Sequence, residues 1–172
     1  MLVGPPCSRK YELAQRISRK YNIPHISVSD LLQQEIKSQN ENSIAIINAM
    51  NSGELVSDRY VFKLLEDRLY ASDCMINGWI LTGFPKTKSQ WNYFEEVNHS
   101  FYPTLVVVIN LLNEESKARS VSRKIDSVTG KFYQIDSDTF ARESEAVKKR
   151  LIVKTEDKPE IFNRRYYLII TL

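Results

Sequence analysis

Long apolar runs, blocks of one charge and internal repeats are all absent from this chain of 172 residues. An apolar run of membrane length or a signal peptide would predict insertion or export, so we expect neither a membrane protein nor a secreted one. No basic run accompanies the net charge of +3, so nucleic acid is not an expected partner. Cys7 and Cys74 lack the spacing of metal ligands, so we expect no metal site, and free thiols in a reducing, cytoplasmic compartment.

The composition is that of one globular domain, with 42% hydrophobic and 26% charged residues. Short apolar runs alternate with amphipathic segments. We expect strands at Leu2–Val3, Trp79–Leu81 and Leu105–Ile109, the last of them buried on both faces. Strands separated by helices predict an α/β fold of three layers, a parallel sheet covered by helices. In such sheets ligands bind at the carboxyl ends of the strands.

Apolar residues at helical spacing predict seven helices: Tyr11–Tyr21, Leu31–Lys37, Ile44–Asn51, Asp58–Tyr70, Ser89–Val97, Glu114–Arg123 and Arg142–Leu151. Ser29 or Asp30 is the expected N-cap of the second helix, and Gly53 closes the third. A turn at Thr129–Gly130 joins two short extended pieces, and the chain finishes with a strand at Tyr166–Leu172. Because little precedes the first loop and nothing follows this strand, we expect residues to be missing at both ends.

The segment Gly4-Pro5-Pro6-Cys7-Ser8-Arg9-Lys10 has the spacing of a phosphate-binding loop, in which backbone N–H groups surround phosphate oxygens and a lysine reaches the outer phosphates. Gly4, Ser8 and Lys10 are its candidate ligand-binding residues. The glycine expected before the lysine is Arg9, and the hydroxyl residue expected after it is Tyr11. The alternative interpretation is that Lys10 is the solvent-facing start of a helix.

Four later segments accompany the loop in a fixed order: residues 25–33 (HISVSDLLQ), 53–58 (GELVSD), 83–90 (GFPKTKSQ) and 123–133 (RKIDSVTGKFY). Together with the loop they resemble the adenylate kinases, over a range from Met1 to about Leu151. The resemblance implies a P-loop nucleotide kinase fold with a helical insert for the monophosphate at about 28–58 and a short lid at about 123–140. It also implies reversible phosphoryl transfer from ATP, used with Mg²⁺, to AMP or another nucleoside monophosphate.

The resemblance also assigns residues to the ATP side. Lys10, Arg123 and Arg150 match phosphate-contacting cations and are the candidate catalytic residues, while Arg119 matches the arginine that stacks on the adenine of ATP. Arg119 and Arg123 are separated by one helical turn, as ordinary surface arginines can also be. Arg150 follows two lysines, so its alternative interpretation is a solvated, cationic helix end.

On the monophosphate side the candidate residues are Asp30, Val56, Gly83, Lys86 and Gln90. Lys86 replaces an arginine that grips the phosphate in the family, and Gln90 matches the glutamine that reads the adenine through its amide. Asp30 has the alternative of a helix N-cap, and Gln90 that of a surface glutamine. His25 is expected to pack rather than to catalyse.

Several departures from the family pattern fall in the same neighbourhood. Cys7 and Arg9 replace glycines, and Glu12 stands where the family has a threonine near magnesium. Thr82 replaces the aspartate that orients magnesium-bound water, and Gln33 replaces a second phosphate-binding arginine. These losses predict weak or absent phosphotransfer.

Two hypotheses remain open at this stage. The first is a divergent nucleoside monophosphate kinase with weak activity. The second is a non-catalytic structural or protein-interaction module within a larger assembly, for which a ciliary or flagellar axoneme is one expected location. Other protein subunits are expected partners only under the second hypothesis.

Overall fold

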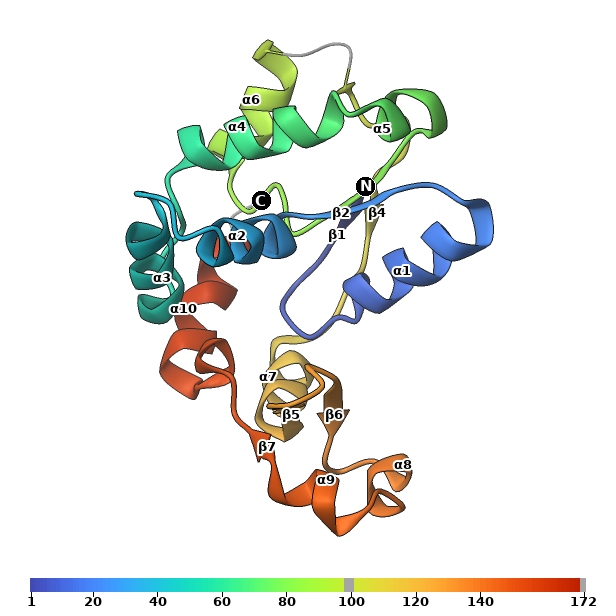
Figure 1. Cartoon of the computed structure of the whole chain (residues 1–172), viewed down its shortest axis with the longest axis vertical. Helices are drawn as coiled ribbons and strands as arrows, with labels where there is room; N and C mark the ends of the chain where they lie inside the picture. The colour runs from blue at the N-terminus through green and yellow to red at the C-terminus, as the bar shows by residue number, and fades with distance from the viewer. Residues whose placement is uncertain (98–100, 171–172) are drawn as a thin grey trace.

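A computed structural model describes residues 1–97 and 101–170 (Figure 1). Its larger sheet has four parallel strands in the order β2-β3-β1-β4 among the described residues. The strands are β1 (Leu2–Val3), β2 (His25–Ser27), β3 (Ile80–Thr82) and β4 (Val107–Val108). The predicted parallel sheet is therefore confirmed, and β2 adds to it a strand that was not predicted by range.

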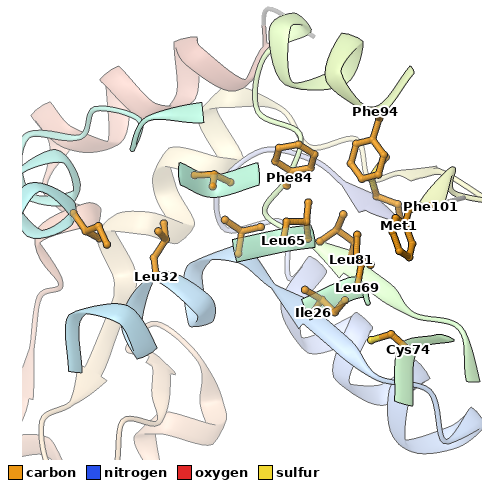
Figure 2. Close-up of a cluster of buried hydrophobic side chains, with 13 residues drawn as sticks. Met1, Ile26, Leu32, Leu65, Leu69, Cys74, Leu81, Phe84, Phe94 and Phe101 are labelled. Atoms are coloured by element: carbon orange, nitrogen blue, oxygen red, sulfur yellow. The ribbon is translucent and has the colours of Figure 1, made fainter. Parts of the chain in front are cut away.

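Helices cover both faces of this sheet. On one face α1 (Lys10–Tyr21) buries Ala14 against Leu2 and Ile80. On the other lie α4 (Asp58–Leu69), α5 (Ser72–Asn77) and α6 (Lys88–Val97). Figure 2 shows the core on that face, where leucines of α4 meet strand residues and Phe84, Phe94 and Phe101. The three predicted layers are present.

The region predicted to bind the monophosphate contains two packed helices, α2 (Val28–Lys37) and α3 (Ser43–Ser52). Gly53 closes α3 with a φ of 73°, as expected. The predicted cap of α2 is wrong: the side chain of Ser27 accepts a hydrogen bond from the backbone N–H of Asp30 at 3.2 Å. The helix begins earlier than its apolar stripe indicates because Ser27, at the end of β2, can cap it.

A second, antiparallel sheet has the order β6-β5-β7. It contains β5 (Arg123–Asp126), β6 (Phe132–Gln134) and β7 (Leu151–Ile152), and the turn between β5 and β6 contains Gly130, as predicted. It follows α7 (Asn113–Ser122) in the chain, and residues 123–140 are the range predicted as a lid. The boundaries of insert and lid stay predictions.

The helix predicted at Arg142–Leu151 is wrong in extent. The structure has α8 (Asp138–Ala141) and α9 (Glu145–Lys149) instead. Ser144 caps α9 by accepting from the N–H of Val147 at 3.4 Å, and Leu151, the first residue of β7, pairs with Asp126 of β5. A serine cap at one end and strand pairing at the other limit this helix to little more than one turn.

The strand predicted at Tyr166–Leu172 is also wrong. After a turn of 3₁₀ helix (η2, Thr155–Asp157), the chain forms α10 (Pro159–Ile170), and residues 171–172 lie outside the described residues. Proline at the first helical position and Glu160 after it favour a helix start. Phe162 and Tyr166, four residues apart, are both buried with ring centroids 5.9 Å apart, which is helical spacing. In the described part of the chain, neither α10 nor another helix is long and apolar enough to cross a membrane.

The strand at Leu105–Ile109 is shorter and more exposed than predicted. Only Val107 and Val108 form β4, and Val108 is 71% exposed. Among the described strands β4 lies at one edge of the sheet, with β1 as its neighbour on one side. An apolar run shows that a strand forms, but its burial depends on what covers its faces.

Candidate functional site

The loop between β1 and α1 keeps a tightly curled backbone. A side chain at Gly4 would place its Cβ 2.8 Å from the carbonyl oxygen of Ile109, so only glycine fits there. Cys7 and Arg9 have φ angles of 57° and 60°, in the left-handed region that favours glycine. This conformation costs a residue with a side chain about 1–2 kcal/mol. The loop therefore has the shape that its lost glycines would favour.

Ser8 lies in the middle of this loop and is buried. Its hydroxyl has no hydrogen-bond partner among the described residues, and it lines the large cavity described below. A buried hydroxyl without a partner is unfavourable unless a ligand or water satisfies it. Curled backbone with neighbouring N–H groups is also a common anion-binding shape. The loop is thus prepared for an oxygen-rich anion.

Lys10 starts α1 and reaches back over the loop, where its Nζ donates to the carbonyl oxygen of Pro5 at 2.8 Å. Burial, and then the charges of Arg165 and Lys86, lower the pKa of Lys10 to about 8. A lysine in this state gains free energy from an anionic neighbour. Lys10 therefore lies against the loop, and its contact with a phosphate stays a prediction.

Two cavities lie at the carboxyl ends of β1, β2 and β3. The larger has a volume of about 880 Å³ and contains the predicted residues Gly4, Ser8, Lys10, Asp30, Gly83, Lys86 and Arg123 in its wall. The smaller has a volume of about 50 Å³, and its wall contains the predicted residues Val56, Gly83, Lys86 and Gln90. Gly83 and Lys86 belong to both walls, so the cavities adjoin each other.

The wall of the larger cavity is strongly cationic. Among the described residues it has eight lysines and arginines against three acidic side chains. Burial, and then the charge of Arg165, lowers the pKa of Lys86 to about 8. Like charges gathered in one cavity oppose each other unless a negative ligand joins them.

Gln90 is held in one orientation at the smaller cavity. Its Oε1 accepts from the backbone N–H of Lys86 at 2.7 Å, and its Nε2 donates to Asp58 Oδ1 at 2.7 Å. One N–H and one oxygen lone pair remain beyond these two bonds. This arrangement leaves Gln90 able to offer both a donor and an acceptor to a base.

Asp30 is the helix residue that Ser27 caps, so its side chain is available for other contacts. Its Oδ2 accepts from the hydroxyl of Tyr11 at 2.8 Å, which links α1 to α2 at the larger cavity. The Tyr11 ring also meets His25 edge-on, with centroids 5.0 Å apart. The residue after the loop lysine thus serves a structural contact.

Arg123 reaches the larger cavity but is already paired. Its Nε donates to Asp157 Oδ2 at 2.8 Å, its Nη2 pairs with the other oxygen of the same carboxylate, and Glu156 lies 3.4 Å from Nη2. Asp157 is buried, so this is a bidentate pair with little water around it. A phosphate would compete with two carboxylates for Arg123.

Arg119 and Arg150 are absent from the walls of both cavities as described. Arg119 pairs with Glu115 at 2.5 Å and donates to the carbonyl oxygen of Cys7 at 3.4 Å. Arg150 pairs with Asp126 at 2.7 Å. Their predicted contacts with ATP stay predictions.

Arg165 is a cavity residue that sequence reasoning missed. It comes from α10, the segment expected to lead into a strand, and lines both cavities. Pro159 followed by Glu160 favours a helix start, and this signal could have predicted a helix that contains Arg165. Glu156, which lies in both walls as well, belongs to η2, for which no element was predicted.

A parallel sheet with helices on both faces, and a curled loop leading from its first strand to a lysine at a helix start, defines a P-loop kinase fold. Comparison with known proteins supports this class: the adenylate kinase family model matches residues 2–167. The chain belongs to the adenylate kinase family.

Curated relatives match along almost the whole chain. It is 33% identical to a rice (Oryza sativa subsp. japonica) protein described as probable adenylate kinase 2, chloroplastic, over 93% of this chain and 54% of that protein. It is 33% identical to the chloroplastic adenylate kinase of Zea mays, covering 97% of this chain and 75% of the relative. It is 31% identical to the adenylate kinase of Buchnera aphidicola, covering 96% and 77%. The chain thus spans about half of the rice protein and three-quarters of the other two.

The family's use of Mg²⁺ with ATP raises the question of whether these residues fit a metal. At the end of β3 the hydroxyl of Thr82 is 2.8 Å from Nε2 of His25, so no carboxylate stands at this position. Glu12 is exposed on α1. Within residues 1–97 and 101–170, no group of three or more His, Cys, Asp or Glu side chains could hold a metal ion. The described residues do not fit a protein-held magnesium ion.

Proposed function

We propose that this chain binds ATP and a nucleoside monophosphate, AMP in the first place, and that its phosphotransfer is weak. The observation that carries the proposal is the buried, unpartnered hydroxyl of Ser8, in a loop whose backbone is left-handed at Cys7 and Arg9. The cationic wall around it supports an anion with several charges. A volume of about 880 Å³ is suitable for a nucleotide, because ligand cavities measure about 300–1,000 Å³.

The two nucleotides would lie on opposite sides of Lys86. The triphosphate would contact the loop N–H groups, Ser8 and Lys10, and the monophosphate would lie beside Lys86 with its base at Gln90. The smaller cavity, about 50 Å³, is below the size of a nucleotide site, so binding there requires its walls to separate. The fixed amide of Gln90 favours a base that offers both an acceptor and a donor, as adenine does.

Weak transfer follows from how the arginines are used. Phosphoryl transfer depends on positioned positive charge at the transferring group. Arg123 is held by two carboxylates, while Arg119 and Arg150 each pair with a carboxylate that lines neither cavity. A charged hydrogen bond contributes roughly 1.5–3 kcal/mol, so losing two in the transition state slows transfer by about a hundredfold to ten-thousandfold.

The test is calorimetric titration and thermal denaturation with ATP, with AMP, and with an analogue that joins two adenosines through phosphates. We expect binding that Lys10→Ala weakens and that Lys117→Ala, an exposed lysine of α7, leaves unchanged. A coupled assay should show slow turnover that Lys10→Ala abolishes. No heat and no thermal shift at millimolar ligand would overturn the proposal.

That negative outcome would favour a second candidate, a non-catalytic module that contacts other proteins. The use of Arg119, Arg123 and Arg150 in internal ion pairs is the observation in its favour. In such a protein these cations stabilise the fold rather than a ligand.

A further inference from the structure

Arg165 lies at the boundary between the two cavities. Its side chain is 24% exposed, and it lines both walls together with Lys86 and Glu156. A residue in both walls lies where ligands in the two cavities would approach each other. The phosphate groups of two nucleotides bound with their bases outward would meet at this boundary.

The guanidinium of Arg165 is only loosely neutralised. Its Nη1 is 3.7 Å from Oε2 of Glu156 and donates to the backbone oxygen of the same residue at 3.4 Å. The Glu156 carboxylate also faces Arg123 at 3.4 Å and Lys154 at 3.4 Å. One carboxylate therefore serves three cations, and its contact with Arg165 is the longest of the three.

The charge of Arg165 reaches the lysines on both sides. It is the largest cause, after burial, of the lowered pKa of Lys10 and of Lys86. Three cations that raise each other's energy in one cavity favour a ligand with concentrated negative charge. A phosphate monoester, with nearly two charges on three oxygens, has this property.

In the wall of the larger cavity, α2 lacks a cation that the family pattern places there. Gln33 stands where the family has a second arginine for the monophosphate, and its amide contacts the sulfur of Met50 at 3.9 Å. Lys86 alone cannot hold two phosphate oxygens in a planar fork as an arginine can. The monophosphate side is therefore one guanidinium short unless another element provides it.

We propose that Arg165 supplies this guanidinium, so that the phosphate of the monophosphate binds between Lys86 and Arg165 and not through the position of Gln33. The inference rests on the proposed function, because it assigns a contact within that binding site. It also gives Glu156 a role: its carboxylate holds Arg165 in place before the ligand arrives and competes with the phosphate for it.

Arg165→Ala is the first test, measured by calorimetric titration of the full chain with AMP and, separately, with adenosine. We expect the Kd for AMP to rise roughly tenfold to a hundredfold, the effect of one lost charged contact, and the Kd for adenosine to stay unchanged. The Kd of Arg165→Lys for AMP should lie between those of the unmodified protein and of Arg165→Ala, and Glu156→Gln should bind AMP more tightly than the unmodified protein. The matched control is Arg164→Ala on the same helix. The Nη1 of Arg164 donates to Ser52 O at 2.8 Å, and its removal should leave both affinities unchanged.

The outcomes separate this inference from the proposed function. If the unmodified protein binds neither AMP nor ATP, the proposed function fails, and the inference fails with it. If AMP binds to the unmodified protein but Arg165→Ala and Arg165→Lys bind it equally well, the inference alone is overturned. Equal losses for AMP and adenosine, or equal losses in Arg164→Ala, would assign Arg165 a structural role and overturn it too.

Discussion

At the scale of single residues, the phosphate loop combines a left-handed backbone with residues that do not favour it. Cys7 and Arg9 both have positive φ, and Arg9 is exposed at the start of α1. An exposed side chain gives little packing energy in return for its strained backbone. The loop conformation is therefore maintained by its surroundings, which include the close approach of Gly4 to Ile109.

Arg9→Gly should stabilise the protein. Glycine adopts positive φ without steric cost, so we expect a gain of about 1 kcal/mol, after allowing for the greater freedom of glycine in the unfolded chain. For a chain of this size that corresponds to a rise in Tm of about 2–4 °C. Thermal denaturation measures it.

The control for this substitution is Arg16→Gly, at an exposed position inside α1. A glycine there should cost about 1 kcal/mol, because the helix interior has ordinary dihedral angles. If both substitutions lower Tm, Arg9 does not have the left-handed backbone described here.

Residue by residue, the sequence predicted positions better than contacts. Lys10, Lys86 and Gln90 lie in the cavity walls, because short motifs fix where the backbone takes them. The arginines are different, since a long side chain reaches whichever carboxylate is near. Arg119 finds Glu115 one helical turn away, and Arg150 finds Asp126, which is distant in sequence. No pattern of residues indicates that competition.

At the scale of elements, the hairpin of β5 and β6 is organised around the buried carboxylate of Asp126. It accepts from the N–H of Val128 at 2.9 Å and the hydroxyl of Thr129 at 2.8 Å, and pairs with Arg150. Burial alone would raise the pKa of Asp126, but the Arg150 and turn contacts together hold it well below its usual range. The carboxylate thus joins the hairpin turn to the end of α9.

Arg150→Ala should therefore loosen the hairpin and leave nucleotide affinity unchanged. Removing the partner of a buried carboxylate should cost about 1.5–3 kcal/mol, and Asp126→Asn should cost a similar amount. Chemical denaturation measures the loss, and hydrogen exchange should localise it to residues 123–134. Weaker ATP binding in Arg150→Ala with normal hairpin protection would instead support the phosphate contact that the family pattern implies.

Elements were predictable where one local signal decided them. The helices α1 to α4, α6 and α7 follow the predicted apolar spacing, whereas the short helix α5 was not predicted. Gly53 and Gly130 end or turn the chain as expected. The final segment was ambiguous, because a short apolar run fits a strand as well as a helix. Tertiary contacts decided there: Phe162 and Tyr166 are buried from the same helix face.

At the scale of the whole molecule, the net charge of +3 conceals an uneven distribution. The larger cavity alone has five more cationic than acidic side chains among the described residues. These cations come from the loop, α1, α2, the segment before α6, β5 and the turn after it, the segment before η2, and α10, so distant parts of the chain produce one electrostatic site. The parallel sheet and its layers were predictable from alternating segments. This convergence depends on α10, whose second half, from Tyr166, was predicted as a strand and whose first half was not assigned to an element.

Nucleotide affinity should fall as pH rises above 8. Lys10 and Lys86 have pKa values lowered from 10.5 to about 8, so both lose their charge in the free protein as pH passes through this value. An anion restores the protons, and at most each lysine costs roughly tenfold in affinity per pH unit above its pKa. Titration at pH 7, 8 and 9, in buffers of different ionisation enthalpy, should show weaker binding and proton uptake.

The stability of the ligand-free protein should change in the opposite direction. The unfolded chain keeps these protons to about pH 10.5, whereas the folded protein releases them near pH 8. Between these values the unfolded state binds more protons, so stability rises with pH. A nucleotide affinity that is constant from pH 7 to pH 9 would contradict the lowered pKa of both lysines, on which both pH predictions rest.

At Cys7 and Arg9 the loop has a left-handed backbone without the glycines that usually accompany it. The residue types of the motif have changed, but its backbone conformation has not. A sequence search for the glycines of the motif would miss this loop, although the φ angles of the loop are in the region that glycine favours. Family members that have diverged in this way can be recognised by main-chain geometry after the consensus residues have been replaced. Returning Cys7 and Arg9 to glycine would then test what their side chains contribute, because the backbone already has the required conformation.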